Sequence, residues 1–213
     1  MPLALFAASM QLAAAQEEHT NDVEPSRAND GPLEPESGDR PSRQEPVVTA
    51  IQGPAAGAGV RLAARGDVAL AEPEAHFTMA YARIGLMPDG GATWLLPRLV
   101  CVRRAQELAL TNRRVSAEEA AAMGLITRVV AKGTLALEVD ALAESLAKSA
   151  VLALGRTKRL LLASGDAALE EQLEAESENI AEQGSTAESK TGIVAFVARR
   201  EPDFVATEVK HDR

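Results

Sequence analysis

The chain has 213 residues, 46% hydrophobic but only 3% aromatic, so one domain with a core of Ala, Leu and Val is expected. Its 31 acidic and 22 basic residues give a formal charge of −9, which argues against a basic face for nucleic acid or an anionic membrane. A single cysteine excludes an internal disulfide and favours a reducing compartment, here the cytoplasm. The three scattered histidines predict no metal site, and no apolar run reaches the ~18 residues of a membrane helix.

The N-terminal 45 residues differ in composition from the rest. Residues 1–15 are apolar and end in three alanines, but no Lys or Arg precedes Arg27, so we do not expect a secretory signal. Residues 16–46 are rich in proline and charge, and few of their side chains are apolar. Such a segment buries too little surface to offset its chain entropy, so residues 1–45 are predicted to be disordered or of low complexity, with no partner.

Alternating strand and helix patterns begin at Val47. The β-branched residues 47–51 predict a buried strand, and a Gly-rich loop follows over residues 53–59. A short helix is predicted for residues 60–65 and a second strand for residues 67–71. Strand, crossover helix and strand together indicate a parallel unit.

The next segments contain a strand, a turn and a helix. Residues 77–81 predict a strand, and Pro-Asp-Gly-Gly at residues 88–91 predicts a turn that leads into a helix from Thr93. Ser116 and Glu119 form a predicted capping box for another helix.

The C-terminal half is mostly helical by pattern. Gly124 is predicted to stop the capped helix, a strand is expected at residues 125–130, and Pro202 is expected to end the last helix. Three apolar helix faces are expected to form core or subunit contacts. These are Leu135, Val139, Leu142 and Leu146; Leu169, Leu173 and Ile180; and Ile193, Phe196 and Val197.

The Gly-rich loop is the first candidate site. It lacks the Gly-Lys-Ser/Thr of a nucleoside-triphosphate loop, and Leu62 stands where a dinucleotide motif needs its third glycine. Two interpretations remain. The small residues allow close packing of a helix on a sheet, or a backbone N–H of Ala58 or Gly59 stabilises an oxyanion, an effect of ~3 kcal/mol per donor.

Asp89 is the second candidate. Between Pro88 and two glycines, it suits a helix N-cap, a general acid/base or a nucleophile. An apolar pocket of Met79, Tyr81 and Met87 around the carboxyl would raise its pKa by desolvation and favour the proton-transfer role. The residues alone do not separate these alternatives.

Three segments together resemble the enoyl-CoA hydratase/isomerase (crotonase) family: residues 46–59, residues 77–91 and residues 116–130. The resemblance implies an α/β fold, a crotonase-like spiral of ββα units at residues 46–205 with a C-terminal helical trimerisation region, followed by a tail at 206–213. It also implies trimers or hexamers. The family's first ββα turns are expected to be missing, and with them one of two oxyanion donors, a loss of about 10²–10³ in rate.

The resemblance also assigns roles to residues. It makes the Ala58 N–H the donor to the thioester oxygen of an acyl-CoA, and places Gly57, Arg61, Tyr81, Met87 and Gly90 in the substrate pocket. The hydratases carry glutamates at the positions of Arg61 and Tyr81, so water addition by two carboxylates is not expected here.

An aspartate at position 89 resembles the phenylacetate-pathway ring-epoxide isomerases. The expected activity is therefore double-bond isomerisation of an acyl-CoA with Asp89 as acid/base. No cofactor is expected beyond the coenzyme A of the substrate. Phe196 and Arg199 match positions that contact the CoA of a neighbouring subunit. The alternatives are a truncated, non-catalytic oligomer subunit or scaffold, and an enzyme like the aryl- or acyl-CoA hydrolases and dehalogenases.

Overall fold

The computed structural model describes residues 45–208. The predicted N-terminal segment 1–45 lies outside this range except for Glu45, and so do residues 209–213 of the predicted tail. In chain order the elements are β1 (Val48–Ile51), β2 (Pro54–Ala56), α1 (Ala58–Ala64), β3 (Val68–Ala71), β4 (His76–Thr78), the 3₁₀ turn η1 (Tyr81–Ile84), α2 (Ala92–Val100), α3 (Val102–Thr111), β5 (Val115–Ser116), α4 (Ala117–Met123), β6 (Arg128–Val129), α5 (Leu135–Ala147), α6 (Val151–Ala163), α7 (Leu169–Ser185), α8 (Ala187–Val197) and α9 (Val205–Glu208).

The strands form two small sheets. In the first, β1, β3 and β6 pair in parallel in the order β1-β3-β6. In the second, β4 lies between β2 and β5, parallel to β2 and antiparallel to β5. The predicted parallel unit is confirmed, because the strands expected at residues 47–51 and 67–71 pair with α1 between them.

The hydrophobic core has two parts. The larger part packs α1, α2, α3 and α4 against both sheets and includes the fully buried Phe77 and Val115. The smaller part packs α5 against the first sheet and consists of Leu70, Val130, Leu135 and Val139. The burial of Leu135 and Val139 confirms the core face predicted for α5.

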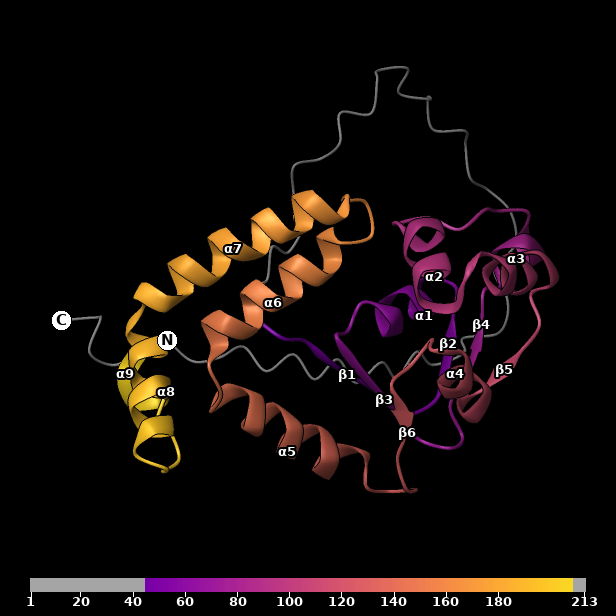
Figure 1. Cartoon of the computed structure of the whole chain (residues 1–213). Coiled ribbons are helices and arrows are strands. Elements are labelled where there is room, and N and C mark those ends of the chain that lie inside the picture. Colours follow the sequence, from indigo (N-terminus) through magenta and orange to yellow (C-terminus); the bar gives the residue numbers. More distant parts are fainter. Residues whose placement is uncertain (1–44, 209–213) are drawn as a thin grey trace, which may run out of the picture.

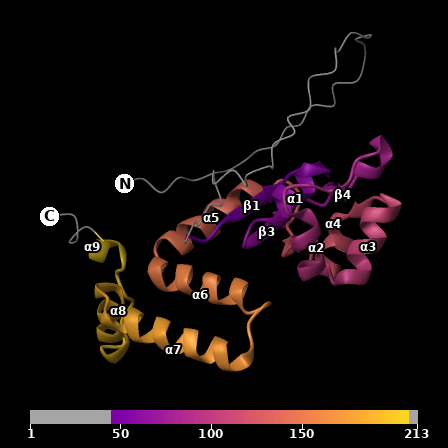
Figure 2. The ribbon, with the colours of Figure 1, turned by 90° about the horizontal axis from the view of Figure 1, so that it is seen from above.

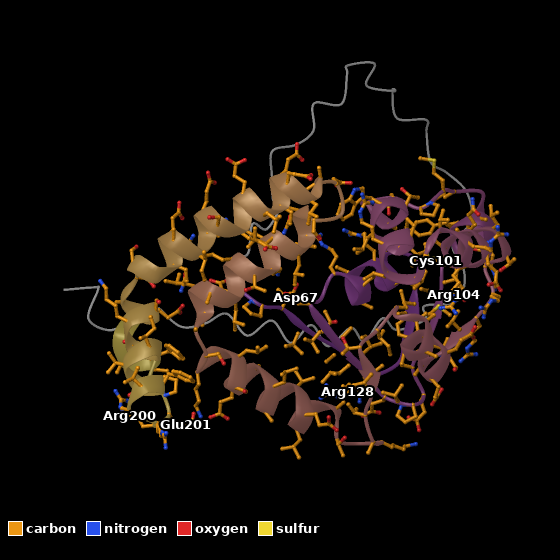
Figure 3. The ribbon with its side chains drawn as sticks, in the orientation of Figure 1. Asp67, Cys101, Arg104, Arg128, Arg200 and Glu201 are labelled. Carbon is orange, nitrogen blue, oxygen red and sulfur yellow. The ribbon has the colours of Figure 1, made fainter. Side chains whose placement is uncertain are left out.

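The first sheet is connected to α6 by Asp67. Its carboxylate accepts a 2.7 Å hydrogen bond from the backbone N–H of Val47 and lies 2.7 Å from Nζ of Lys158 on α6. Figure 3 shows Asp67 between α6 and the strands. This ion pair fixes the start of the C-terminal helical region relative to the strands.

Helices α6, α7 and α8 extend away from the two sheets, as both ribbon views show (Figures 1 and 2). The apolar faces predicted on α7 and α8 are exposed in this chain, with Leu169, Leu173, Ile180, Ile193, Phe196 and Val197 all accessible. Of the two roles expected for these faces, burial in this chain's own core does not occur. Their use as subunit contacts stays a prediction.

Several element boundaries differ from those expected. The loop predicted at residues 53–59 contains β2, and the following helix begins at Ala58 instead of Val60. The strand predicted at residues 77–81 ends at Thr78, because Ala80 has a left-handed backbone with φ 58° that a strand cannot contain. The strand predicted at 125–130 is reduced to β6.

The helix-terminus predictions were correct only in part. Ser116 accepts a hydrogen bond from the backbone N–H of Glu119 at 3.2 Å, and Gly124 ends α4 with φ 86°. The Glu119 carboxylate, however, pairs with Arg113, so only half of the expected capping box forms. Pro202 does not end the last helix, because α8 ends at Val197 and α9 follows the proline.

Candidate functional site

The Gly-rich loop becomes the turn from β2 into α1. Gly57 adopts φ 52° and donates its N–H to the carbonyl of Thr78 at 3.0 Å, which ties this turn to the end of β4. Ala58 is the first residue of α1, and its N–H has no acceptor within residues 45–208. Such a first-turn N–H is available to a ligand oxygen.

Four predicted pocket residues converge beside this turn. A Cβ built on Gly57 would lie 3.7 Å from the Tyr81 ring, so the ring packs against the turn. A Cβ built on Gly90 would lie 2.8 Å from Nε of Arg61, one turn beyond Ala58 on α1. The fold therefore brings together α1, η1 and the loop before α2.

Asp89 joins this group through Tyr81. The phenolic hydroxyl of Tyr81 donates a hydrogen bond of 2.8 Å to Oδ1 of Asp89. Burial raises the pKa of Tyr81, and the hydrogen bond and negative charge of Asp89 raise it further, while the positive charge of Arg61 acts in the opposite sense.

The Asp89 side chain does not cap α2, which was one of the roles considered for it. The N-cap of α2 is Gly91, with φ 86° and no side-chain cap, and Asp89 contributes only its backbone carbonyl, which accepts from the Ala92 N–H at 3.0 Å. The Asp89 carboxylate therefore remains free for the contact with Tyr81.

The apolar pocket expected around Asp89 does not form as described. Met79 is buried in the core, but Met87 is 80% exposed and Asp89 is exposed as well. The reason is the 3₁₀ turn after Ala80, which carries the chain from Tyr81 to Met87 out of the strand. Met87 is therefore not brought into the group around Arg61.

A small apolar cavity lies on the other side of Met79 and Pro88, without Asp89 among its lining residues. It has a volume of about 170 Å³ and is lined by Met79, by Pro88, which precedes Asp89, and by side chains of α2 and α3. The α2 and α3 residues are Ala92, Thr93, Leu96, Pro97, Val102, Ala105, Gln106 and Ala109. The sequence reasoning missed these residues. The signal was the run of small apolar side chains on the two helices, a pattern that ordinary core packing also produces.

Helices α2 and α3 join at a sharp break that shapes this cavity. Cys101 separates them with φ 66°, a backbone conformation rare for a residue with a side chain. Its thiol is free and exposed, at the position labelled in Figure 3. The break lets Val102 and Leu96 line the same cavity from consecutive helices.

Phe196 and Arg199 lie elsewhere. Phe196 on α8 is 84% exposed, and Arg199 follows the helix with φ 52°. Figure 1 shows α8 at the opposite end of the molecule from α2 and α3. Within this chain, the fold therefore does not bring the two residues to the group around Asp89.

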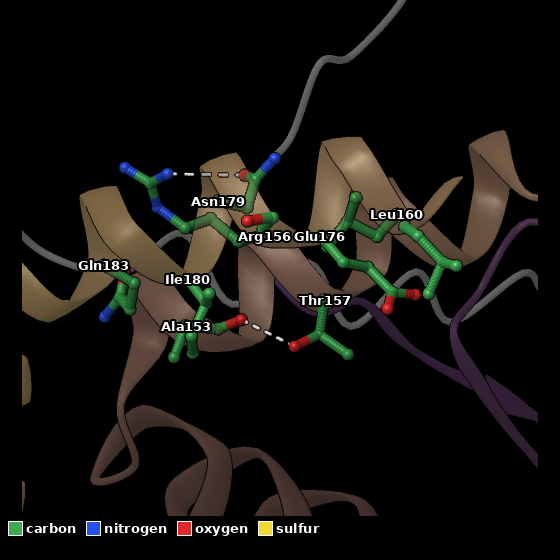
Figure 4. A pocket seen from close by; sticks show the side chains of 10 residues that line it. Ala153, Arg156, Thr157, Leu160, Glu176, Asn179, Ile180 and Gln183 are labelled. Carbon is green, nitrogen blue, oxygen red and sulfur yellow. Dashed lines mark hydrogen bonds between the residues drawn. The ribbon is translucent and has the colours of Figure 1, made fainter. Parts of the chain in front are cut away.

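A larger groove of about 510 Å³ separates α6 from α7 (Figure 4). Its charged and polar groups are largely satisfied by one another. Arg156 binds Glu182 at 2.6 Å and Asn179 at 3.3 Å, and Thr157 donates to the carbonyl of Ala153 at 2.9 Å. This groove was not predicted. Arg156, Asn179 and Thr157 have partners there, whereas Oε1 of Gln183 is buried without one among the described residues.

No group of three or more His, Cys, Asp or Glu residues in the described part of the chain is placed to hold a metal ion. Over residues 45–208, no helix has the length and apolarity that crossing a bilayer requires.

Comparison with known proteins shows consistent similarity. The sequence profile of the family described as enoyl-CoA hydratase/isomerase matches residues 5–207. The 1,2-epoxyphenylacetyl-CoA isomerase of Escherichia coli (strain K12) is 41% identical over 160 residues, which are 75% of this chain and 61% of that protein. A protein of Rhodobacter capsulatus named "Probable enoyl-CoA hydratase" is 41% identical over 159 residues, 75% of this chain and 62% of that protein.

Solved structures agree with the expected fold. The crystal structure of an enoyl-CoA hydratase/isomerase from Cupriavidus metallidurans CH34 superimposes with a TM-score of 0.72 at 40% identity, covering 76% of this chain and 61% of that one. The predicted crotonase-like α/β fold is thereby confirmed. The chain spans about three fifths of the length of these relatives.

Proposed function

Because the chain belongs to the enoyl-CoA hydratase/isomerase family, we propose that it is an enzyme that binds an acyl-CoA thioester and shifts a double bond of the acyl group. The observation that carries this proposal is that Tyr81 binds the Asp89 carboxylate through its hydroxyl while its ring packs against the turn that holds the unpaired N–H of Ala58. One group suits a proton transfer and the other suits a developing oxyanion.

The proposed reaction starts at the thioester. The Ala58 N–H donates to the carbonyl oxygen, which makes the α-proton more acidic because charge that develops on this oxygen is stabilised. The Asp89 carboxylate removes the α-proton of a β,γ-unsaturated ester, and the electron pair of that C–H bond moves into an enolate. Asp89 then returns the proton at the γ-carbon, so the double bond moves to the α,β position.

Tyr81 and Arg61 support isomerisation more than hydration. Neither side chain is a carboxylate. Asp89 is therefore the single carboxylate among the residues that meet beside Arg61. Adding water across a double bond needs a base for the water and an acid for the carbon, whereas isomerisation moves one proton between two carbons. The E. coli relative named 1,2-epoxyphenylacetyl-CoA isomerase agrees with this choice.

We further propose that the acyl group enters the apolar cavity between α2 and α3. Its lining begins at Pro88, so an acyl chain held there would have its carbonyl end near Asp89. A volume of about 170 Å³ suits a short chain. The substrate carries its own coenzyme A, so the proposal requires no resident cofactor.

The oligomer and the cellular site belong to the same proposal. A homotrimer or hexamer would bring the exposed Phe196 and Arg199 of one subunit to the CoA of its neighbour. The guanidinium of Arg199 would then contact a CoA phosphate. The single cysteine agrees with a reducing compartment, so we place the protein in the cytoplasm.

A non-catalytic oligomer subunit or scaffold is the second candidate. The apolar side chains on α7 and α8, among them Ile180 and Phe196, lie exposed in the single chain and suit burial against other subunits. This role requires the helices but not the Asp89 carboxylate.

The two candidates differ in proton exchange. With a saturated acyl-CoA such as butyryl-CoA in heavy water, the enzyme should exchange the α-proton for deuterium. Asp89→Asn should abolish the exchange and leave the dissociation constant for the ester within a few-fold. Exchange that survives in Asp89→Asn would rule out Asp89 as the base. Absence of any acyl-CoA binding by calorimetry would favour the subunit role.

A further inference from the structure

Arg61 is a cation without a protein partner in the candidate site. Its Nε is fully buried and has no hydrogen-bond acceptor within the described part of the chain. Its two terminal nitrogens have no acceptor among residues 45–208 either, and they are not among the fully buried unpaired atoms. The guanidinium is therefore covered at Nε and open at its end.

Four other arginines of the described chain have carboxylate partners. Arg98, Arg113, Arg128 and Arg156 each bind a carboxylate at 3.2 Å or less. These pairs lie at or near the surface, where water would solvate the charge in any case. Arg61, with its covered Nε, has more to gain from an anion than they have, because unpaired polar groups cost most where water is excluded.

The Asp89 carboxylate does not fill this role. Asp89 accepts its hydrogen bond from Tyr81, and no ion pair joins it to Arg61 in the described structure. Gly90 packs against Arg61 and helps to hold the guanidinium where it is. The site thus contains a positive group and a negative group that do not neutralise each other by direct contact.

We propose that Arg61 selects acyl-CoA esters whose acyl group carries a second carboxylate. A guanidinium binds a carboxylate through two parallel hydrogen bonds, a geometry that a neutral acyl chain cannot supply. The proposal rests on the function proposed above, because it assumes that the thioester oxygen is held by Ala58.

The position of Arg61 also limits the length of such an ester. Arg61 follows Ala58 by three residues on α1, a rise of about 4.5 Å along a helix. Arg61 does not line the cavity between α2 and α3, so the acyl group of such an ester would lie along α1 instead of in that cavity. Its carboxylate would then lie a few carbons from a thioester held at Ala58. Short dicarboxylic acyl groups meet this condition.

The test compares two saturated esters that cannot be isomerised. Isothermal titration calorimetry of the full chain with glutaryl-CoA and with pentanoyl-CoA measures binding without any turnover. We expect wild type to bind glutaryl-CoA about tenfold more tightly at low salt, as one charge-assisted pair allows. Arg61→Met should remove this preference, and Arg61→Lys should keep part of it. The matched control is Arg65→Met, an exposed arginine at the end of the same helix, which should keep the full preference.

The outcomes separate the inference from the proposed function. If wild type binds both esters equally, or if Arg61→Met keeps the preference, the inference is wrong and the proposed function stands. If wild type binds neither ester, the proposed function fails and the inference fails with it. Circular dichroism of each variant before the titration identifies a variant that has not folded, and Arg61→Lys then provides the comparison.

Discussion

The phenolic oxygen of Tyr81 lies 2.8 Å from Oδ1 of Asp89 and donates a hydrogen bond to it. The two residues are eight positions apart, and the 3₁₀ turn after Ala80 brings them together. Through this bond Tyr81 fixes one oxygen of the carboxylate and leaves the other for a substrate proton. Tyr81 is thus a positioning residue in the mechanism we propose.

The first prediction concerns the titration of Tyr81. It is the single tyrosine of the chain, so the absorbance of tyrosinate reports on it alone. Burial, and then the hydrogen bond and charge of Asp89, raise its pKa above the ordinary value near ~10. We expect Asp89→Ala to lower this pKa towards that value. Asp140→Ala, at an exposed position on α5, should leave it unchanged.

The sign of the pH effect follows from the raised pKa. The neutral phenol donates the bond, so the stability that it contributes is complete below about pH 10, the unfolded pKa. This stability is lost as the pH rises through the higher pKa of the folded state. A Tyr81 pKa that is the same in wild type and Asp89→Ala would contradict the bond.

The sequence predicted the parts of the fold that depend on local composition. The β-branched run at residues 47–51, the strand at 67–71 and the stop at Gly124 follow from side-chain shape and backbone freedom, and all three occur. The left-handed backbone at Ala80 was not predictable, because no local rule places a non-glycine residue there. The exposure of Met87 has the same cause, because this residue follows the turn.

In the candidate site, too, the residues could be predicted from the sequence but their contacts could not. Ala58, Arg61, Tyr81 and Gly90 were named from the motifs, and the fold brings them together. Their contacts were not predictable, since the unpaired Nε of Arg61 depends on how α1 packs against the loop before α2. Periodicity placed the apolar faces of α7 and α8, but it does not show which surface, within or outside the chain, covers them.

The second prediction separates backbone strain from crowding at Gly90. Alanine at Gly90 must adopt φ 55° and also displace the Arg61 side chain, whose Nε would lie 2.8 Å from the new Cβ. Gly85 also has a positive φ, 73°, but open space around it. Each alanine variant should lose about 1 kcal/mol of unfolding free energy from strain. Only Gly90→Ala should also weaken binding of glutaryl-CoA.

The comparison needs a variant without strain. Gly53→Ala has neither a positive φ nor a neighbouring atom within 4 Å, so its unfolding free energy should stay near that of wild type. Equal glutaryl-CoA affinity in Gly85→Ala and Gly90→Ala would show that the contact between Gly90 and Arg61 has no role in binding.

The third prediction concerns Arg113, which connects the end of α3 to α4. Its guanidinium binds Glu107 at 2.7 Å and both oxygens of Glu119 at 2.6 and 2.9 Å. The hydrogen bonds from Arg113 hold the pKa of Glu119 below its usual range. Because these side chains are a third to a half exposed, solvent screens the pair, and Arg113→Met should cost only about 1 kcal/mol in urea unfolding.

The pH dependence tests the same network. A carboxyl with a lowered folded pKa gives stability above its unfolded pKa, about 4.3, and loses it as the pH falls through the folded value. The difference in unfolding free energy between wild type and Arg113→Met should therefore shrink between about pH 7 and about pH 3. Arg103→Met, at an exposed position on α3, should show no such convergence. A difference independent of pH would mean that Arg113 acts through packing alone.

The fourth prediction concerns Glu188, a buried carboxylate at the start of α8. Its two oxygens accept the backbone N–H groups of Leu152 and Ala153 at 3.0 and 3.1 Å and the amide of Gln183 at 2.7 Å. It thereby caps α6 with an anion, which the helix dipole favours, and joins the ends of three helices.

Glu188→Gln turns one acceptor into a donor that faces other donors, so we expect a loss of about 2 kcal/mol in urea unfolding. Hydrogen exchange should quicken first at Leu152 or Ala153, at the N–H group whose acceptor oxygen becomes the amide nitrogen. Glu178→Gln, an exposed change on α7 of the same chemistry, should alter neither measurement. If Glu188→Gln is as stable as the Glu178 variant, α6 and α8 are held together by their apolar contacts and not by this carboxylate.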